Sequence, residues 1–322
     1  MEEQDKLCVV VPCYNEEEVL PETVSRLTQK LRSLMERGLV SQGSRMLLVD
    51  DGSRDRTWEL IRQYHQENPL VEGLKLARNR GHQNALLAGL MAAKERYDVT
   101  ISMDADLQDD MDAMDAMVEK YREGCHIVYG VRNNRDTDTP FKRGTALAFY
   151  RLMNAMGAET VYNHADYRLM SRCALEGLSQ FREVNLFLRG MVPMIGYRTG
   201  VVEYRRGERF AGESKYPLIK MLNFAADGIT SLSVRPIRVM AGVGVFLFCG
   251  GCFWLLALLI LFLLGREPAG ITVAIASIWT AAGLNLLGLG IIGEYLGKVY
   301  LETKDRPRYL VETELFHPTR AA

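Results

Sequence analysis

Two aspartates separated by one residue, Asp104 and Asp106, form the pattern in this sequence with the most specific chemistry. They follow an apolar run, residues 99–103, of the kind that forms a buried strand. Two carboxylates at a strand end can bind one hard cation, which takes further oxygen ligands from a substrate. Gln108, two residues later, could add a carbonyl oxygen. An isolated pair of this form is also common on protein surfaces. It is the position of this pair directly after a predicted buried strand that favours a metal site.

A nucleotide-sugar is a substrate that fits such a pair of carboxylates. Its diphosphate supplies oxygen ligands, and a divalent cation stabilises the negative charge that the diphosphate carries as it leaves. The pattern therefore predicts metal-assisted glycosyl transfer.

A second acidic pair, Asp50 and Asp51, precedes Gly52 and Ser53 and allows two explanations. One is an ordinary turn that is closed by side-chain hydrogen bonds. The other is that one aspartate accepts a hydrogen bond from the imide N–H of a uracil-type base. Either of the two aspartates could make that contact.

Cationic side chains are concentrated between residues 198 and 238, where eight basic residues accompany four acidic ones. Arg209 and Lys215 belong to this segment. Such a cluster can rest on anionic lipid headgroups, or it can bind the phosphates of a donor and an acceptor. Both explanations hold together if the acceptor phosphate lies at headgroup level.

The elements that must position these residues alternate in type. Apolar runs of strand length alternate with segments whose apolar residues recur every three or four positions, as in amphipathic helices. The expected strands span residues 7–12, 46–49, 71–76 and 99–103, and the expected helices span 17–37, 57–67 and 84–95. This order predicts an α/β fold with a mostly parallel, Rossmann-like sheet. Ligands bind at the carboxyl ends of such strands, so residues 14–16, 50–51 and 104–106 should form one site.

Two long stretches without charge follow this part of the chain. Residues 239–264 and 269–293 contain 26 and 25 residues without Asp, Glu, Lys or Arg. As helices they would each reach about 37 Å, against about 30 Å for the hydrocarbon core of a bilayer. Four residues separate them, which predicts a two-helix transmembrane hairpin. The alternative is a pair of buried helices in a soluble core, which are rarely so long and so uniformly apolar.

The charges that flank these stretches predict their orientation. Arg235 and Arg238 precede the first stretch, and Lys298 and Lys304 follow the second. The positive-inside rule then places the N-terminal domain and both termini in the cytoplasm. The acidic N-terminus, residues 1–5, has no features of a signal peptide.

The overall composition narrows the class of partner. The formal net charge is -1 and the isoelectric point is about 6.6, so no global basic field favours nucleic acid. Four of the six cysteines are scattered without disulfide-like spacing, which agrees with a cytoplasmic location. Cys249 and Cys252 form a CxxC pair inside an uncharged stretch, which favours small packing residues over a metal site. The expected partners are a nucleotide-sugar, a lipid acceptor and the membrane itself.

Taken in order, the motifs resemble those of family 2 glycosyltransferases with the GT-A fold. The likeness is to the polyprenyl-phosphate branch, and within it most to bactoprenol glucosyltransferases, with dolichol-phosphate-mannose synthase and the undecaprenyl-phosphate aminoarabinose transferase as relatives. It covers nearly the whole chain. The motifs are Val11-Pro12-Cys13-Tyr14-Asn15-Glu16, Val49-Asp50-Asp51-Gly52-Ser53, Asn79-Arg80-Gly81-His82-Gln83, Asp104-Ala105-Asp106-Leu107-Gln108, Ala165-Asp166-Tyr167-Arg168-Leu169-Met170 and Gly212-Glu213-Ser214-Lys215-Tyr216.

The resemblance implies an organisation in four parts. Residues 1–217 would form a cytoplasmic GT-A domain, 218–238 interfacial juxtamembrane helices, 239–293 the two transmembrane helices and 294–322 a cytoplasmic tail. Related enzymes often form tetramers, which implies a homo-oligomer.

The resemblance also implies roles for matching positions. The nucleotide pocket would be lined by Pro12, Tyr14, Glu16, Asp50 and Asp51. Mg²⁺ or Mn²⁺ would be held by Asp104, Asp106 and Gln108. Phosphate groups near the acceptor or the donor would be bound by Arg132, Arg209 and Lys215. Asp166 and Arg168 would lie on the acceptor side. The local sequence Gly130-Val131-Arg132 departs from the Gly-Ser-Arg that is common in this branch.

The implied reaction is an inverting transfer of a hexose, with glucose from UDP-glucose as the leading donor, to undecaprenyl or another polyprenyl phosphate. UDP-N-acetylglucosamine, UDP-galactose, GDP-mannose and a modified arabinose donor stay open. A processive polysaccharide synthase would need a translocation channel, which two spans cannot enclose. It would also need a Q/R-x-x-R-W motif, which this sequence does not contain. A non-catalytic scaffold disagrees with the intact Asp104, Asp106 and Gln108.

Overall fold

The computed structural model describes residues 4–132, 164–184, 186–205, 246, 260, 263–264 and 270–318. The chain divides into two compact units. The sheet unit contains residues 1–150, 159–217 and 306–322, and the helical unit contains residues 151–158 and 218–305.

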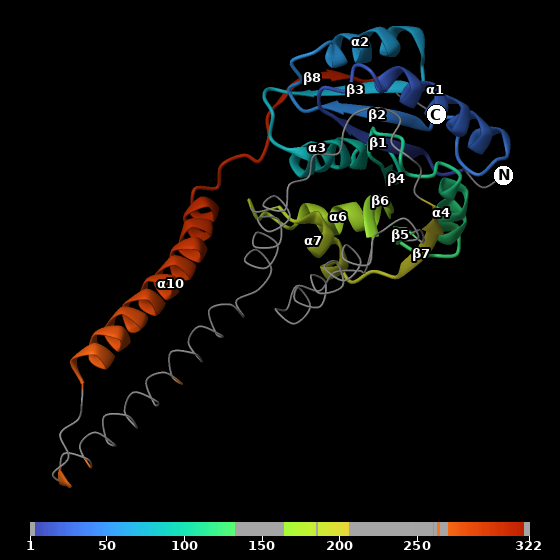
Figure 1. The fold of residues 1–322 in the computed structure, drawn as a ribbon. Helices are drawn as coiled ribbons and strands as arrows, with labels where there is room; N and C mark the ends of the chain where they lie inside the picture. The colour runs from blue at the N-terminus through green and yellow to red at the C-terminus, as the bar shows by residue number, and fades with distance from the viewer. Residues whose placement is uncertain are drawn as a thin grey trace. The chain divides into compact units, whose positions relative to one another are not determined.

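The sheet unit is built on one eight-stranded mixed sheet with the order β7-β5-β6-β4-β1-β2-β3-β8 (Figure 1). Its central strands, β4-β1-β2-β3, run parallel. On one side β6 pairs antiparallel with both β4 and β5, and β7 pairs parallel with β5. The strands are β1 Leu7–Cys13, β2 Arg45–Asp50, β3 Val71–Leu76, β4 Val99–Ser102, β5 Ile127–Arg132, β6 His164–Ser171, β7 Thr199–Tyr204 and β8 Val311–Leu315.

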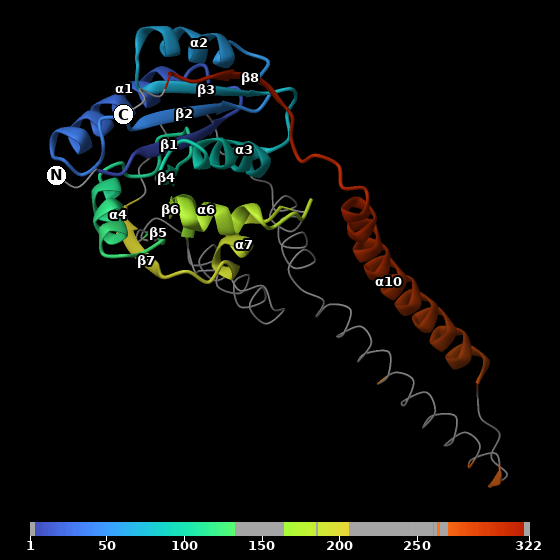
Figure 2. The ribbon, with the colours of Figure 1, turned by 180° about the vertical axis from the view of Figure 1, so that it is seen from behind.

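Helices cover both faces of the sheet, as the two opposite views show (Figures 1 and 2). One apolar core joins the sheet to α1 Leu20–Glu36, α2 Thr57–Glu67 and α4 Ala113–Arg122. The other core joins it to α3 His82–Lys94, α6 Arg172–Ser179 and α7 Leu188–Met194. Successive residues of a strand point to opposite faces. Val9 and Val11 therefore belong to the first core and Cys8 and Val10 to the second, which explains why β1 is apolar throughout.

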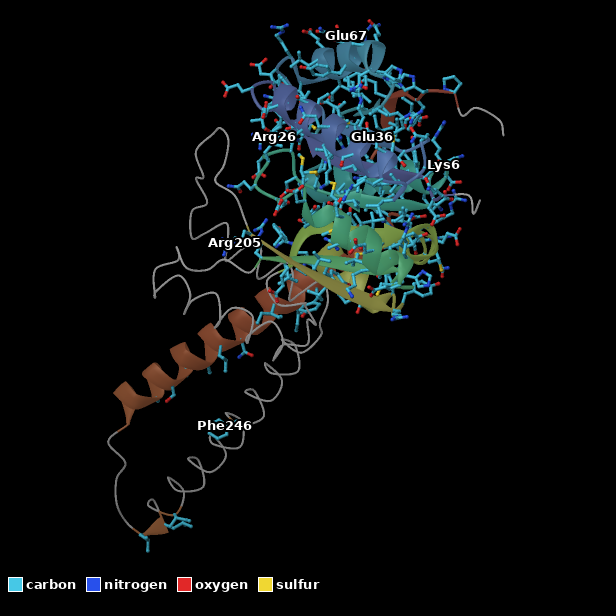
Figure 3. The ribbon with its side chains drawn as sticks, turned by 90° about the vertical axis from the view of Figure 1, so that its right-hand side faces the viewer. Lys6, Arg26, Glu36, Glu67, Arg205 and Phe246 are labelled. Carbon is cyan, nitrogen blue, oxygen red and sulfur yellow. The ribbon has the colours of Figure 1, made fainter. Side chains whose placement is uncertain are left out.

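The strands and helices predicted for the first 100 residues are confirmed, with ends that differ by a few residues. Their apolar pattern is produced by burial in these two cores. The outer surface is charged, with Arg26 and Glu36 exposed on α1 and Glu67 at the end of α2 (Figure 3).

The strand β8 was not foreseen, because its segment was interpreted as part of a tail. It pairs antiparallel with β3 at the edge of the sheet. Lys75 Nζ lies 2.9 Å from Glu312 Oε1, and the Arg96 guanidinium lies 4.1 Å from the centre of the Phe316 ring. The C-terminal segment is therefore part of the sheet unit.

The helical unit contains one long described helix, α10 Ile271–Thr303, with 33 residues. It overlaps the second uncharged stretch. The first stretch lies outside the described residues apart from Phe246, Ile260, Leu263 and Leu264. No helix among the residues that the structure describes combines the length and the hydropathy that a membrane crossing requires.

Candidate active site

The loops after β1 and β2 are joined by hydrogen bonds that involve the polar residues predicted there. The Asn15 amide donates to Ser53 Oγ (3.0 Å), and Asn15 Oδ1 accepts from the Arg54 amide (2.9 Å). The Glu16 amide donates to Thr57 Oγ1 (2.8 Å). Asn15 adopts φ 54°, a left-handed conformation that asparagine tolerates better than most residues. The two strand ends thus form one continuous surface.

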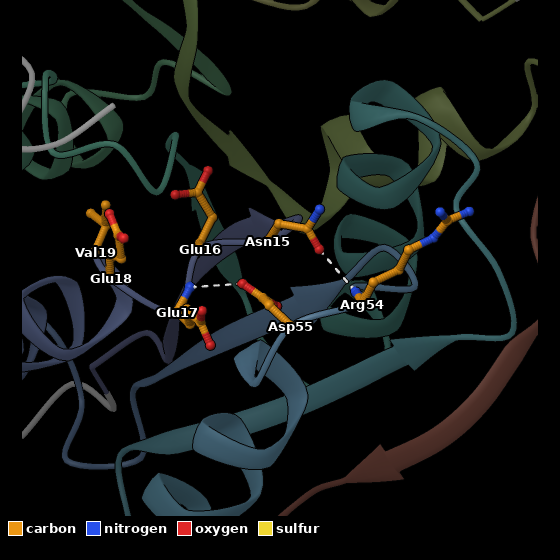
Figure 4. Close-up of a pocket in the computed structure, with 7 residues that line it drawn as sticks. All are labelled: Asn15, Glu16, Glu17, Glu18, Val19, Arg54 and Asp55. Carbon is orange, nitrogen blue, oxygen red and sulfur yellow. Dashed lines mark hydrogen bonds between the residues drawn. The ribbon is translucent and has the colours of Figure 1, made fainter. Parts of the chain in front are cut away.

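A cavity of about 480 Å³ opens between these loops (Figure 4). Glu16 lines it, together with Asn15 and Arg54. Tyr14 is exposed beside this loop, whereas Pro12 is buried within β1 opposite Val49. Of the residues predicted for a nucleotide pocket, Glu16 lines the cavity itself and Tyr14 and Pro12 flank it along the chain.

Asp50 and Asp51 are both buried but have different partners. Asp50 Oδ1 accepts from the Ser53 amide (3.2 Å) and closes the local turn. Asp51 reaches across to the loop before α3, where it accepts from the amides of Arg80 (2.7 Å) and Gly81 (2.9 Å). Burial raises the pKa of both carboxyl groups, and these hydrogen bonds oppose the rise. We call Asn15, Asp50, Asp51 and their backbone partners the Asp51 network.

Gly52, between Asp51 and Ser53, is required by the close approach of two loops. Its φ is 66°, and a Cβ atom there would lie 2.6 Å from the backbone nitrogen of Asn79. Glycine therefore lets the loop after β2 touch the loop before α3, which places the Asp51 carboxylate against the Arg80 and Gly81 amides.

Asp104 and Asp106 follow β4 at the same edge of the sheet. The Asp104 side chain is 34 % exposed, yet its Oδ1 is buried and has no hydrogen bond within the described part of the chain. Burial raises the pKa of Asp104 to about 6; His82 opposes the rise, and nearby carboxylates add to it. Asp106 Oδ1 accepts from the Gln108 amide (3.3 Å) across a turn in which Leu107 adopts φ 57°.

Asp166 lies beside Asp104 because of the strand register. Ser102 of β4 pairs with Arg168 of antiparallel β6, so the register extended by two residues sets Asp166 opposite position 104. His82, the first residue of α3, lies between the two carboxylates. Its Nε2 is 3.5 Å from Asp104 Oδ1 and 3.6 Å from Asp166 Oδ2.

Two arginines complete what we call the Asp166 cluster, which consists of His82, Asp166, Arg168 and Arg189. Arg168 Nη2 lies 2.6 Å from Asp166 Oδ1, and Arg189 contacts both Asp166 oxygens, through Nε at 3.3 Å and Nη2 at 3.1 Å. Burial alone would raise the pKa of Asp166, but Arg189, His82 and Arg168 hold it well below its usual value. For His82, burial would lower the pKa of the imidazole, but the neighbouring carboxylates of Asp166 and Asp104 raise it above its usual value. The cluster therefore keeps Asp166 ionised.

Arg132, at the end of β5, lies against the loop that carries the aspartate pair. Its Nη2 is 3.4 Å from Asp109 Oδ1, and its Nε donates to the Tyr204 hydroxyl (3.1 Å). Tyr204 in turn donates to Asp109. Arg132 thus links β5, β7 and the loop after β4.

The structure brings most of the predicted site residues to one edge of the sheet. Those at this edge are Pro12, Tyr14, Glu16, Asp50, Asp51, Asp104, Asp106, Gln108, Arg132, Asp166 and Arg168. Arg209 and Lys215 lie outside the described residues. The sequence interpretation did not assign His82 or Arg189. His82 had a weak signal, its place before a helix, whereas Arg189 is 23 residues from Asp166 and had none.

A sequence profile described as "Glycosyl transferase family 2" matches residues 8–178, which include the Asp51 network, the aspartate pair and β6. The chain belongs to glycosyl transferase family 2. This confirms the resemblance drawn from the motifs, and the protein is a glycosyltransferase.

Individual relatives of this family 2 glycosyltransferase match it over nearly their full length. "Uncharacterized glycosyltransferase YkoT" of Bacillus subtilis (strain 168) is 54 % identical over 314 residues, covering 98 % of this chain and 93 % of that protein. "Bactoprenol glucosyl transferase" of Shigella phage SfX is 38 % identical over 313 residues, covering 96 % and 99 %. Among solved structures, "Mannosyltransferase PcManGT from Pyrobaculum calidifontis in complex with GDP-Man and Mn2+" is similar with a TM-score of 0.46, at 18 % identity over 93 % of this chain and 86 % of that one.

Proposed function

We propose that this glycosyltransferase transfers glucose from UDP-glucose to a polyprenyl phosphate and inverts the anomeric carbon. The proposal draws on relatives named as bactoprenol glucosyl transferases, which are 36–38 % identical over at least 95 % of this chain. UDP-N-acetylglucosamine, UDP-galactose, GDP-mannose or a modified arabinose donor would use the same site. The choice among these sugars depends on the shape of the pocket, which must distinguish the orientation of single hydroxyl groups.

The observation that carries the proposal is the environment of Asp104. A buried carboxylate oxygen without a hydrogen bond is costly unless something binds it, and Asp104 Oδ1 is such an oxygen within the described residues. Asp104, Asp106 and Gln108 are oxygen donors that suit Mg²⁺ or Mn²⁺, although the described residues hold no group of three His, Cys, Asp or Glu side chains with metal-binding geometry. Diphosphate oxygens would supply the remaining ligands. When bound, the cation would stabilise the departing nucleoside diphosphate.

The two sides of Asp104 suit the two substrates. The loops after β1 and β2, with the cavity beside Glu16, would hold the nucleotide. The Asp166 cluster would face the acceptor. A phosphate monoester is already an ionised nucleophile at neutral pH, so the reaction requires no general base, and Asp166, whose pKa is held low, need not act as one.

The membrane is part of the proposal. The uncharged stretches 239–264 and 269–293 and their basic flanks support an anchor in the bacterial inner membrane with the sheet unit on the cytoplasmic side. An anchored enzyme meets a lipid acceptor that is confined to the bilayer plane. We include in the proposal a homo-oligomer and phosphate contacts from Arg209 and Lys215.

Transfer of radiolabel from a panel of UDP- and GDP-sugars to undecaprenyl phosphate, with and without Mg²⁺ or Mn²⁺, tests the proposal. We expect a labelled lipid from UDP-glucose that disappears in EDTA. A labelled lipid from another donor would correct the sugar, and transfer that persists in EDTA would contradict the role of the metal. If no donor gives a labelled lipid, the proposal that a polyprenyl phosphate is the acceptor would be contradicted.

A further inference from the structure

Arg189 is the cation of the Asp166 cluster that is both oriented and accessible. Its guanidinium contacts Asp166 through two nitrogens, at 3.3 and 3.1 Å, which fixes the plane of the group. The Arg189 side chain is 34 % exposed, whereas that of Arg168 is only 2 % exposed. Arg168 therefore serves as the buried partner of Asp166, and Arg189 adds a second positive charge at the surface of the site.

The segment that carries Arg189 is fixed in place on both sides. The Leu188 amide donates to Gln83 Oε1 (2.9 Å) near the start of α3, and the Leu188 carbonyl accepts from Arg168 Nη1 (3.4 Å). The neighbouring side chains Leu188 and Met191 are buried in the core that also contains α3. The position of Arg189 beside Asp166 is thus set by packing before any ligand binds.

The charges leave a positive surplus at this point. Asp166 carries one negative charge, and Arg168 already balances it at 2.6 Å. Arg168 and Arg189 both contact this one carboxylate, so the described contacts of the Asp166 cluster set two guanidinium groups against a single carboxylate. A guanidinium that is oriented, partly exposed and shares its carboxylate with a second arginine is suited to phosphate oxygens.

We propose that Arg189, oriented by Asp166, binds a phosphate group of the substrates on the β6 side of Asp104. This inference rests on the proposed function and adds a specific residue to it. Two phosphates could occupy the position, that of the prenyl acceptor and that of the donor next to the sugar. Because β6 lies on the opposite side of β4 from β1 and β2, the acceptor phosphate is the expected one.

Binding measurements on the purified full-length protein test the inference without relying on turnover. Calorimetry with farnesyl phosphate, a soluble prenyl monophosphate, reports the acceptor site, and calorimetry with UDP and Mn²⁺ reports the donor site. Arg189→Gln is expected to weaken farnesyl phosphate binding by about 10- to 100-fold, since it removes a charge-assisted contact. Arg189→Lys, which keeps the charge but loses the planar fork, is expected to weaken it by about 3- to 10-fold.

The matched control is Arg172→Gln. Arg172 is also a partly exposed arginine paired with an aspartate, at 3.2 Å from Asp98, but Asp98 precedes β4 whereas Asp104 follows it. Arg172→Gln should bind both probes as the wild type does. Should Arg189→Gln fail to fold, Arg189→Lys retains an ion pair with Asp166 and carries the test.

The outcomes separate this inference from the proposed function. Weaker binding of farnesyl phosphate supports the acceptor phosphate, and weaker binding of UDP supports the donor phosphate. If the Arg189 variants bind both probes as Arg172→Gln does, or if the wild type binds neither probe, the inference is overturned. Failure of the wild type to transfer glucose, with these binding effects intact, would contradict the proposed function alone.

Discussion

The Asp51 network and the Asp166 cluster both hold buried carboxylates at one edge of the sheet, but their partners differ in kind. Asp50 and Asp51 accept hydrogen bonds from backbone amides, of Ser53 and of Arg80 and Gly81. Asp166 contacts the charged side chains of Arg168 and Arg189 and lies 3.6 Å from His82. One side of Asp104 is built from neutral dipoles and the other from ions.

This difference predicts different responses to substitution. A backbone amide stays in place when a side chain changes, so a lost carboxylate there costs about one hydrogen-bonding interaction. A buried guanidinium that loses its carboxylate leaves an uncompensated charge, which costs more. Substitutions on each side and at the aspartate pair between them test this contrast.

The largest effect on activity is expected at Asp104 and Asp106, which lie between the Asp51 network and the Asp166 cluster. Asp104→Asn and Asp106→Asn should each reduce sugar transfer by at least about 100-fold, because each removes a charge that holds the cation against the diphosphate. Thermal unfolding should change little. Asp110→Asn, in the same loop but exposed, is the control for transfer assays. Full activity of either variant, or of the wild type in EDTA, would show that the reaction does not depend on a metal ion.

The largest effect on stability is expected at Asp166. Asp166→Asn should lower the free energy of unfolding by about 3–5 kcal/mol, since Arg168 is buried and loses its closest carboxylate. Urea denaturation measures this. Asp112→Asn, whose 88 % exposed side chain pairs with Lys30, should cost less than about 1 kcal/mol. Equal losses of unfolding free energy in the two variants would mean that the ion pairs of the Asp166 cluster stabilise the fold no more than a surface ion pair does.

A smaller effect is expected in the Asp51 network. Asp51→Asn keeps one oxygen for the Arg80 or Gly81 amide but turns an NH₂ group toward the other, so the expected loss is about 1–3 kcal/mol. The same urea experiment measures it. A loss larger than that of Asp166→Asn would reverse the comparison between the two sides.

The smallest effect concerns pH at the β3–β8 edge, beyond the Asp51 network. The ring of His317 stacks on that of His65 at 4.1 Å, and its Nε2 lies 3.2 Å from the Val71 carbonyl oxygen. Burial and the His65 charge lower the pKa of His317, so folding favours its neutral form. Its stabilising contribution is complete above the unfolded pKa of about 6.5 and is lost as pH falls through that value toward the lower folded pKa.

Thermal unfolding of the wild type and of His317→Gln at pH 7.5 and 5.5 measures this contribution. The wild type should lose more stability than the variant on acidification, by less than about 1 kcal/mol. Glu72, Arg96 and Arg45 are the other charged groups near this edge, and they are common to both proteins. Identical pH profiles would show that the folded environment does not favour the neutral imidazole.

The amino-acid sequence was sufficient to predict the strands β1 to β4, the helices between them and the aspartate pair. The strands are mostly apolar runs, and the helices repeat apolar residues every three or four positions, so both patterns can be recognised locally. The strand ends then follow, and with them the positions of Asp50, Asp51, Asp104 and Asp106. The family motifs added Asp166, Arg168 and Arg132, without the contacts that Asp166 makes to His82 and Arg189 or that Arg132 makes to Asp109.

The contacts between distant segments follow from the tertiary structure and not from any local pattern. Strand β8 is five residues long, carries Glu312 and Glu314, and becomes a strand because β3 offers it an edge. His82 and Arg189 meet Asp166 because the antiparallel register of β6 on β4 and the packing of α3 and α7 in one core bring them together. Local periodicity encodes whether a residue is buried, but the choice of its partner depends on strand register and helix packing, which no local pattern specifies.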